Sequence, residues 1–436
     1  MLTYPFQVAS TVGAITCNIK PSFGPGQDFE NGTDIILFRN RLEVDTIHAI
    51  PVTRNEEGKN PNAGDKPALL VKYPDPVGFV PLGAKRPDGT PHPHAGTGFG
   101  TARASAWPLD DAALVETPER RGRKTFEGKQ YYMYWELLQF KYDGRNFQVS
   151  GREKLASDEL IPGWVMSCPA LTNAIPDGDD LLTAMSGGRR GRPHGAGVVR
   201  WKRVANSWRP VSFQLVTGEE GASATTELTE KGHAQQLEGA IEPSLVRDLD
   251  GELLLSARGR RNTGHPIRVW KSSNQGQKWK LVIFCGGISS APVSLNRAAD
   301  GTPYIAANRY QYQTHLKGMP SIPYFIGPDG KPRPDGGTRE TLVLWPLNEA
   351  RNALQIPVIA RDCLAEFGPP PHGTLWSVDH PSAMTVQLAD GRWHNLIGYR
   401  IFEKEENTHF VDPTPYTGAY LEEVISAGEA LPMWNF

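Results

Sequence analysis

A series of Asp-Gly dipeptides, each followed closely by a short apolar or aromatic stretch, divides the sequence into hairpin-sized units. Asp-Gly between two strand-like stretches predicts a tight β-hairpin, because the type I′ turn needs positive φ. The chain also has 45 Gly and 37 Pro in 436 residues, against a usual combined share of about 12%. Both features favour many short strands over long helices. The dipeptides include Asp143-Gly144, Asp177-Gly178, Asp250-Gly251, Asp300-Gly301 and Asp390-Gly391.

Repetition of such hairpins around an axis gives a β-propeller, which protects its strand edges by closing a ring. The length of the chain accommodates six or seven four-stranded blades. We therefore predict an all-β fold, a single propeller domain over residues 1–436. Its long polar loops are expected at Asn55–Pro67 and Ile326–Thr338, where they would shape a pocket. A pair of β-sandwich domains is the alternative architecture.

The composition excludes several classes of protein. With 46 Lys and Arg against 48 Asp and Glu, the formal net charge is −2, whereas a nucleic-acid surface needs clustered positive charge. No apolar stretch approaches about 18 residues, so we expect no membrane span. Cys17, Cys168, Cys285 and Cys363 are widely spaced, and the sequence reveals neither a zinc signature nor a disulfide framework.

The N-terminal residues Met1–Phe6 have neither the basic start nor the apolar core of a secretory signal. Two locations are therefore open at this point. The protein either stays in the cytoplasm, or it is secreted and its signal has been removed from the sequence.

One stretch combines a carboxylate, a tight turn and a guanidinium. Glu242 stands at the start of one strand-like segment, and Arg258 ends the next, beyond the Asp250-Gly251 turn. A little further on, the octapeptide Ser272–Trp279 fits the pattern Ser-x-Asp/Asn-x-Gly-x-x-Trp. In such a hairpin the Ser and Asn side chains bond to the turn backbone and the Trp packs between sheets. We interpret the octapeptide as a marker of the fold.

These residues resemble the sialidase superfamily of Asp-box propellers, most clearly from Ile241 to Arg400. The resemblance implies that Glu242 polarises a nucleophilic tyrosine and that Arg258 is one of three arginines that bind the substrate carboxylate. Arg339, just before the strand-like Thr341–Leu344, looks like another of these arginines. Guanidinium groups bind carboxylates through paired, charge-assisted hydrogen bonds, which suits these roles. A purely structural ion pair between Glu242 and Arg258 is the alternative.

The chain departs from the family pattern at two places. The family's first arginine lies in an Arg-Ile-Pro-like phrase near the N-terminus, for which Phe38–Arg41 is only a loose substitute. The nucleophilic tyrosine would precede the last Asp-Gly hairpin, where this chain has His380-Pro381. Since proline cannot attack an anomeric carbon, either another tyrosine serves or the chemistry has changed. The tyrosines nearby in the sequence are Tyr399, Tyr416 and Tyr420.

Histidines occur in three phrases that suit acid–base chemistry, because imidazole titrates near neutral pH. His92 and His94 lie among prolines that stiffen the backbone and glycines that let a ligand approach it. His194 follows a basic segment, and Asp379 can raise the basicity of His380. The predicted catalytic residues are Glu242, His92, His94, Asp379 and His380. The predicted substrate-binding residues are Arg190, His194, Arg258 and Arg339.

His92 and His94 have two other interpretations. Alternating residues of an extended segment point to the same face, so the two imidazoles could bind one metal ion. The sequence supplies no evident set of further ligands, and either residue can also be a loop histidine bonded to backbone. We therefore predict no metal site and no cofactor.

Three functions are consistent with these residues. The preferred prediction is a glycoside hydrolase of exo-sialidase type, which cleaves at a sialic or uronic sugar. The second is a polysaccharide lyase, because some propellers of this broad architecture use His to remove the proton next to a uronic-acid carboxylate. The third is a carbohydrate-binding propeller without turnover, since fold alone does not determine function. In each case the expected partner is an acidic oligosaccharide or glycan.

Overall fold

Strands dominate the described part of the computed structural model. Apart from one short helix, α2 (Cys363–Phe367), its regular structure is β-strand. Before residue 78, and in parts of some later strands, only the backbone is described. The structure describes residues 2–7, 12–17, 31–39, 43–53, 70–106, 124–126, 129–143, 147–154, 160, 165–169, 174–188, 195–217, 240–258, 267–285, 292–298, 300–308, 324–326, 332–334, 339–355, 357–372, 375–387, 393–404, 416 and 418–424.

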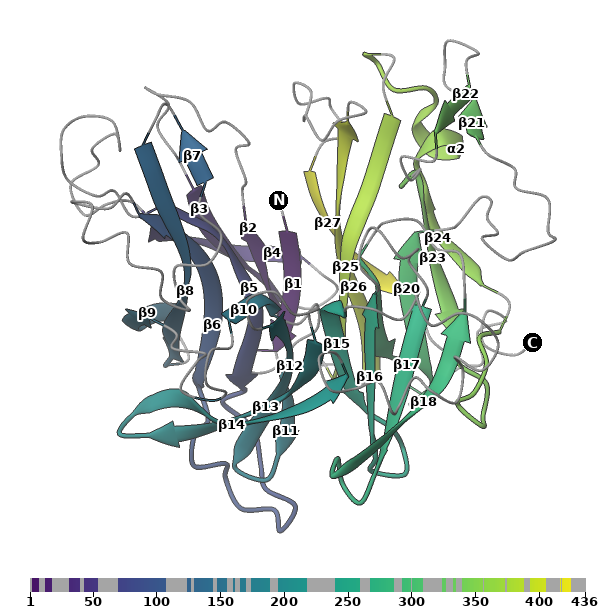
Figure 1. Ribbon diagram of the computed structural model, residues 1–436. Coiled ribbons are helices and arrows are strands. Elements are labelled where there is room, and N and C mark those ends of the chain that lie inside the picture. Colours follow the sequence, from purple (N-terminus) through teal and green to yellow (C-terminus); the bar gives the residue numbers. More distant parts are fainter. Residues whose placement is uncertain are drawn as a thin grey trace.

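The strands before residue 218 form three antiparallel sheets in the described ranges (Figure 1). The first sheet contains β1 (Leu2–Gln7), β2 (Val12–Cys17), β3 (Asn31–Arg39) and β4 (Glu43–Thr53). The second contains β5 (Leu70–Val80), β6 (Thr97–Ala106) and β8 (Lys129–Tyr142), with β7 (Lys124–Phe126) and β9 (Phe147–Lys154) paired to β8. The third contains β10 (Val165–Pro169), β12 (Asp180–Gly188), β13 (Gly195–Val204) and β14 (Ser207–Thr217), with β11 (Ile175–Asp177) paired to β12.

The later strands form three further sheets and a separate hairpin. The fourth sheet contains β15 (Ile241–Arg247), β16 (Leu253–Arg258), β17 (Ile267–Ser273) and β18 (Lys278–Cys285). The fifth contains β19 (Ser294–Arg297), β20 (Pro303–Asn308), β23 (Thr341–Pro346) and β24 (Val358–Asp362), and the hairpin contains β21 (Tyr324–Ile326) and β22 (Pro332–Pro334). The sixth contains β25 (Leu375–Gln387), β26 (Trp393–Lys404) and β27 (Gly418–Val424).

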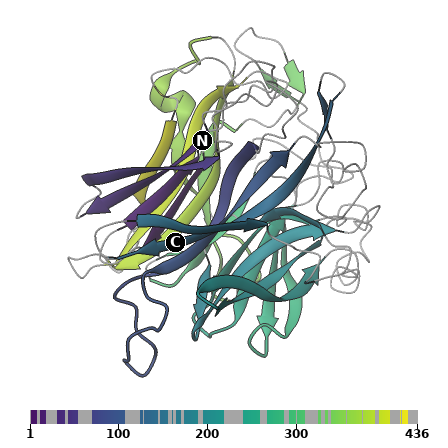
Figure 2. The same ribbon diagram turned by 90° about the vertical axis from the view of Figure 1, so that its left-hand side faces the viewer.

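The sheets pack against one another in chain order and close into a ring. β15 contacts β12 of the preceding sheet and β19 of the following one, and β19 contacts β25. β1 contacts both β25 and β26, so the first sheet lies beside the last; Figure 2 shows the purple and the yellow-green strands together. Such closure defines an all-β propeller of four-stranded blades. The prediction of this architecture is confirmed.

Buried polar side chains connect the first strands of neighbouring sheets. Ser244 Oγ on β15 accepts a hydrogen bond of 2.6 Å from the backbone N–H of Leu295 on β19. Asn296 Oδ1 on β19 accepts one of 3.0 Å from the backbone N–H of Ala383 on β25. Since buried polar groups are costly when they are left unpaired, these bonds favour one alignment of each sheet against the next.

The Asp-Gly dipeptides lie at hairpin turns where the structure describes them, but only the glycine of each has a positive φ, so these turns are not of type I′. Asp177-Gly178 leads from β11 to β12, Asp250-Gly251 from β15 to β16, and Asp300-Gly301 from β19 to β20. Gly251 and Gly301 have φ values of 85° and 91°, which glycine adopts without a steric penalty. Gly144 and Asp390-Gly391 lie outside the described residues.

The octapeptide Ser272–Trp279 forms the hairpin between β17 and β18. Ser272 Oγ accepts a 2.7 Å hydrogen bond from the Leu253 backbone N–H and donates one of 2.6 Å to Glu252 Oε2. Trp279 Nε1 donates to the Gly276 carbonyl at 2.9 Å, and its ring packs against the apolar core. These contacts support its interpretation as a structural element.

Apolar side chains fill the space between neighbouring sheets. One core cluster joins Val198 of the third sheet to Leu255 and Trp270 of the fourth. Another joins Tyr304 of the fifth sheet to Trp376 of the sixth. Burying one large apolar side chain is worth about 1.5–3 kcal/mol, so this packing fixes the strand ends from which the site is built.

The structure also bears on the predicted loops. Residues 55–67 lie outside the described part of the chain, whereas 326–338 includes β22, which pairs with β21. The second segment is therefore a small hairpin over part of its length rather than a structureless loop.

Among the described helices, none is both long and apolar enough to cross a membrane.

Candidate active site

Glu242 and Arg258 come together at one end of the fourth sheet. Glu242 lies at the start of β15 and Arg258 at the end of β16, and the ladder pairs Ile241 with Arg258. Arg258 Nε donates a hydrogen bond to Glu242 Oε2. The two side chains retain only 16% and 13% of their exposure, so this ion pair is mostly shielded from water.

The backbone at Glu242 has a form that non-glycine residues rarely adopt. Its φ is 51°, and the β15–β16 register shifts between Ile241 and Ser244. Pro243 has no N–H to donate to the ladder, which suits a bulge at this position. A left-handed, non-glycine residue costs about 1–2 kcal/mol, and such strain is typical of functional sites.

His380 occupies the equivalent position on β25. Its φ is 52°, and the β25–β26 register shifts between Asp379 and Ser382. The tripeptide His380-Pro381-Ser382 thus repeats the bulge of Glu242-Pro243-Ser244, two sheets away. The same backbone device therefore directs a carboxylate in the fourth sheet and an imidazole in the sixth.

The electrostatic surroundings of Glu242 show which charges lie near it. Burial acts to raise the pKa of its carboxyl, but the charge and hydrogen bond of Arg258 lower it, and the charges of His380 and Arg339 lower it further. The net effect holds the pKa of Glu242 below its ordinary value. The structure thus brings together four of the predicted residues from three sheets.

Arg339 stands just before β23, and its backbone is attached to β25. The Arg339 carbonyl accepts a 2.6 Å hydrogen bond from the Val378 backbone N–H, and Arg339 forms a parallel bridge with Ser377. The Asn308 carboxamide also donates to the Arg339 carbonyl, at 3.2 Å. The Arg339 backbone is therefore attached to the strand that carries His380.

His92 and His94 lie at the other end of the blades. His92 is buried, its Nε2 is 3.3 Å from the carbonyl oxygen of Gly178, and its Nδ1 accepts from the His94 backbone N–H at 3.2 Å. Gly178 belongs to the turn before β12, which corresponds to the Asp250-Gly251 turn of the fourth sheet. Since Glu242 lies at the opposite end of β15, the predicted union of these histidines with Glu242 does not form.

His94 is half-buried and packs against two aromatic rings. Its ring meets the edge of Trp208 at a centroid distance of 5.5 Å and that of His92 at 5.7 Å. Burial lowers the pKa of His94, and the charges of His92 and Arg203 lower it further. Within the described residues, no group of three or more His, Cys, Asp or Glu side chains is arranged to hold a metal ion.

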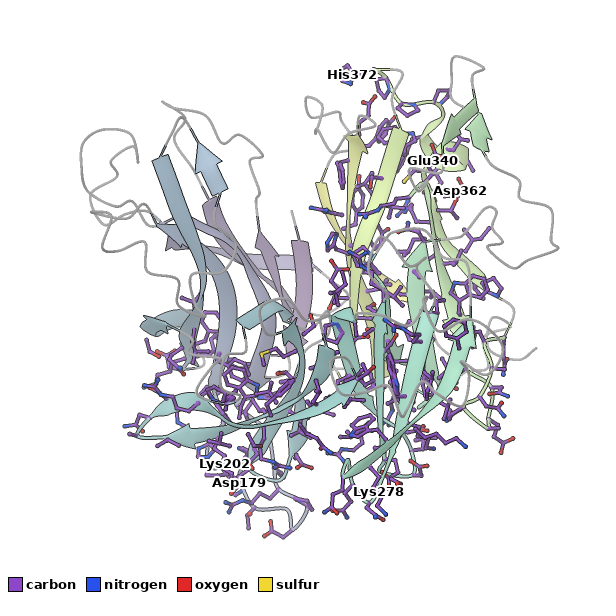
Figure 3. All side chains as sticks on the ribbon, in the orientation of Figure 1. Asp179, Lys202, Lys278, Glu340, Asp362 and His372 are labelled. Carbon is purple, nitrogen blue, oxygen red and sulfur yellow. The ribbon has the colours of Figure 1, made fainter. Side chains whose placement is uncertain are left out.

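An exposed ion pair lies near these two histidines. Arg86 Nε donates to Asp179 Oδ1 at 2.7 Å, and the two side chains retain 38% and 40% of their exposure. Figure 3 shows Asp179 at the lower end of the molecule, with Glu340 and Asp362 near the upper end. The hydrogen bond from Arg86 is the main reason why the pKa of Asp179 lies below its ordinary value.

The side chains of three predicted residues lie outside the described part of the structure. Arg190 and His194 lie outside the described residues, between the end of β12 and the start of β13. For Asp379 only the backbone is described, and it pairs with Arg400 on β26. Their predicted roles therefore stay predictions.

The alternative tyrosines lie in an aromatic cluster around Arg361. Tyr399 is fully buried, and its hydroxyl accepts a 2.9 Å hydrogen bond from Arg361 Nε. The Tyr420 ring stacks on Tyr399 at 5.7 Å, and its hydroxyl donates to the Tyr416 carbonyl at 2.7 Å. Tyr416 in turn stacks on Phe367 at 4.4 Å. The described hydrogen bonds of Tyr399 and Tyr420 thus serve this cluster.

Sequence reasoning missed Glu340, the neighbour of Arg339. Glu340 is buried with 4% exposure, and its pKa is raised to about 7, chiefly by burial and then by the charge of Asp362. A glutamate before an apolar segment is an ordinary pattern, so the sequence offers no signal for this burial. The site end of the propeller therefore contains two glutamates whose pKa values move in opposite directions.

The fold is similar to solved structures at low sequence identity. Trypanosoma rangeli sialidase in complex with sialic acid matches with a TM-score of 0.51 and 10% identity, over 97% of this chain and 53% of that chain. A mutant of NanB sialidase from Streptococcus pneumoniae matches with a TM-score of 0.50 and 9% identity, over 97% and 68%. A Dyadobacter fermentans protein of unknown function matches with a TM-score of 0.53 and 11% identity, over 97% and 94%.

These likenesses concern the fold. The chain spans about half the length of the T. rangeli sialidase and nearly the whole length of the D. fermentans protein. No protein-family model and no curated protein sequence matches the chain. The all-β ring, the Asp-box hairpin and the solved structures agree that this chain has the fold of a sialidase-like β-propeller.

Proposed function

We propose that this protein is a carbohydrate-active enzyme that hydrolyses a glycosidic bond at an acidic sugar, as a glycosidase of exo-sialidase type. The observation that carries this proposal is the ionised, mostly buried Glu242, which lies within the field of Arg258, Arg339 and His380. Among these four groups, the charges of Arg258 and Arg339 already exceed that of Glu242, and His380 adds to the excess when it is protonated. Such a site suits an anionic ligand.

Each residue has a role that its chemistry supports. Arg258 and Arg339 bind the sugar carboxylate through charge-assisted hydrogen bonds. Glu242 takes a proton from water as the water oxygen bonds to the anomeric carbon, and His380 gives a proton to the departing glycosidic oxygen. Water is the proposed nucleophile, because the described hydroxyls of Tyr399 and Tyr420 bond within the Arg361 cluster.

Elimination next to a uronic acid is the second candidate, and the place of His380 favours it. His380 stands where the family resemblance implies a tyrosine, and its neutral imidazole can act as a base. It would remove the proton from the carbon beside the carboxylate while the bond to the leaving oxygen breaks. A carbon–carbon double bond forms, and the leaving oxygen takes up a proton. Arg258 and Arg339 would stabilise the charge that develops on the carboxylate.

One experiment separates these routes. The protein is incubated with a fluorogenic sialoside, a fluorogenic glucuronide and uronate polysaccharides, while fluorescence and ultraviolet absorbance are followed. Hydrolysis releases the fluorophore, whereas only elimination creates an absorbing unsaturated sugar. Glu242→Gln, which keeps the shape of the side chain, is the control that should abolish hydrolysis, because Glu242 is the proposed base of that route. Saturable binding of acidic sugars without product supports a binding propeller. If the protein neither binds these sugars nor forms product, the proposal is rejected.

We also infer that the propeller has six blades. The described strands make six sheets of three to five strands, and the contacts of β1 with β25 and β26 support closure after the sixth. A crystal structure with a seventh sheet between β27 and β1 would reject this number.

A further inference from the structure

Asn308 lies at the end of β20, in contact with the segment that carries Arg339. Its side chain is buried with 1% exposure. Its Nδ2 is 2.6 Å from the Val378 carbonyl oxygen, 3.2 Å from that of Arg339 and 3.2 Å from that of Thr341. One carboxamide therefore contacts two sheets, because Val378 belongs to β25 and Thr341 to β23.

The chemistry of this position requires a donor. A carboxamide nitrogen has two hydrogens, so the three carbonyl oxygens must share them. An aspartate of the same shape would present only acceptors to these three carbonyls. The carbonyls of Val378 and Thr341 belong to buried residues, and an unmatched buried carbonyl is costly.

The residues held by Asn308 are those that place the proposed site. Val378 both accepts from Asn308 and donates its backbone N–H to the Arg339 carbonyl at 2.6 Å. His380 follows Val378 by two residues on the same strand, at the bulge. Arg339 and His380 both lie near enough to Glu242 to lower the pKa of its carboxyl. The Asn308 contacts thus lie between the two cationic groups.

We propose that Asn308 is a positioning residue, whose carboxamide sets the place of Arg339 relative to His380 across the boundary between the fifth and sixth sheets. The effect on an acidic ligand rests on the proposed function. The attachment of the Arg339 segment to β25 does not, because it is a property of the fold alone. The two parts can therefore be tested separately.

Asn296 is a matched control in the same sheet. It is buried with 2% exposure and also reaches β25, but its Oδ1 accepts from the Ala383 backbone N–H, beyond the bulge. An aspartate at position 296 keeps this acceptor, whereas an aspartate at position 308 loses the donor that the three carbonyls share. Both changes put a carboxyl group into a buried place. Asn308→Asp and Asn296→Asp therefore differ mainly in whether the link to β25 survives.

The first measurement is hydrogen–deuterium exchange of the backbone. In Asn308→Asp we expect at least about tenfold faster exchange at Val378, because its N–H loses a fixed partner. Exchange at Leu295, whose N–H bonds to Ser244, should stay unchanged. Asn296→Asp should leave Val378 protected. If Asn308→Asp does not fold, Asn308→Ala removes the same donor without a buried charge. Asn296→Ala is then the control, because it breaks the bond to Ala383 but leaves the Val378 contacts in place, so Val378 should stay protected.

The second measurement is the affinity for free sialic acid and for glucuronic acid, each compared with its methyl ester. The ester removes the charge, so the ratio of affinities reports how strongly the cationic groups of the site bind the carboxylate. We expect Asn308→Asp to reduce this ratio by about tenfold, since small displacements of binding groups are costly, and Asn296→Asp to preserve it. A general loss of stability would weaken acid and ester alike.

The outcomes distinguish the two proposals. If the wild-type protein binds neither acid, the proposed function fails, while exchange at Val378 still tests the attachment. If exchange at Val378 is equal in the two aspartate variants, or if both lower the ratio equally, Asn308 is not a positioning residue. Faster exchange at Val378 with an unchanged ratio shows an attachment that does not govern ligand binding, and it also overturns the proposal.

Discussion

Two regions of the molecule contain a histidine near an acidic side chain and an arginine, yet they are built differently. At one end of the blades, Glu242, Arg258, Arg339 and His380 come from three sheets. At the other end, His92 and His94 share one loop, and their partners belong to the next sheet. The first region brings charged side chains together from several blades. In the second region, His92 accepts a hydrogen bond from the His94 backbone, and His94 packs on Trp208.

The difference also appears in the backbone. Glu242 and His380 have φ values of 51° and 52°, and each precedes a proline at a bulge. The two regions differ in exposure as well, because the Arg86–Asp179 pair beside His92 and His94 is exposed. Strain that is repeated at equivalent positions requires support from the surrounding sheets. Histidine-rich sequence is therefore a weaker sign of a site than convergence of charged side chains from separate blades.

The largest expected effect compares the two ion pairs. Arg258→Ala leaves the mostly buried Glu242 without its hydrogen-bonded partner, which should cost about 3 kcal/mol or more in the free energy of unfolding. Arg86→Ala breaks an exposed pair and should cost less than about 1 kcal/mol. Urea denaturation measures both values. Equal losses would mean that the two regions do not differ in their electrostatics.

Arg258→Ala also tests the role of the guanidinium. It should weaken the binding of acidic sugars far more than that of neutral ones, because the proposed contact with the sugar carboxylate is lost. Arg86→Ala should leave both affinities unchanged. Equal losses for acidic and neutral sugars would instead support a structural ion pair between Glu242 and Arg258.

The next effect concerns Glu340, which lies beside Arg339 in the first region. Its folded pKa is raised to about 7, mainly by burial and then by Asp362, so folding favours the protonated carboxyl. The contribution of Glu340 to the free energy of unfolding is fully present below the unfolded pKa of about 4.3. It decreases by about 3 kcal/mol as the pH rises to about 7. Glu340→Gln should remove this loss, and denaturation at several pH values measures it. A wild-type protein and a variant with parallel pH profiles would contradict the prediction.

His380→Gly separates activity from stability. Glycine relieves the positive φ, which should recover about 1 kcal/mol and offset part of the lost side-chain interactions. Turnover should nevertheless fall by about a hundredfold, because the proposed acid–base group is removed. His94→Ala, in the second region, should reduce stability and leave kcat unchanged. If His94→Ala lost turnover while His380→Gly kept it, the assignment of the two regions would be reversed.

The sequence contained enough information for the fold and for part of the site. Asp-Gly turns and the Ser272–Trp279 octapeptide are local signals, so they predict hairpins that the structure contains. Glu242 and Arg258 are joined by one hairpin, and their meeting follows from its register. By contrast, the burial of Glu340 and the three contacts of Asn308 depend on packing between sheets. His92 and His94 show the same limit, because their phrase does not reveal which end of the blade it occupies.

The smallest expected effect compares two carboxylates whose pKa values are both lowered. At Glu242, burial acts to raise the pKa, and the lowering comes from Arg258 first and then from His380 and Arg339. At Asp179, the hydrogen bond from Arg86 is the main cause of the lowered pKa. A lowered folded pKa contributes stability that is present above the unfolded pKa and lost as the pH falls through the folded one. Glu242→Gln should therefore flatten the acid side of the stability profile. Asp179→Asn should flatten it less, because solvent screens an exposed pair. Denaturation between neutral pH and pH about 3 measures both slopes. A steeper dependence on Asp179 would mean that the charges gathered around Glu242 act more weakly than their burial implies.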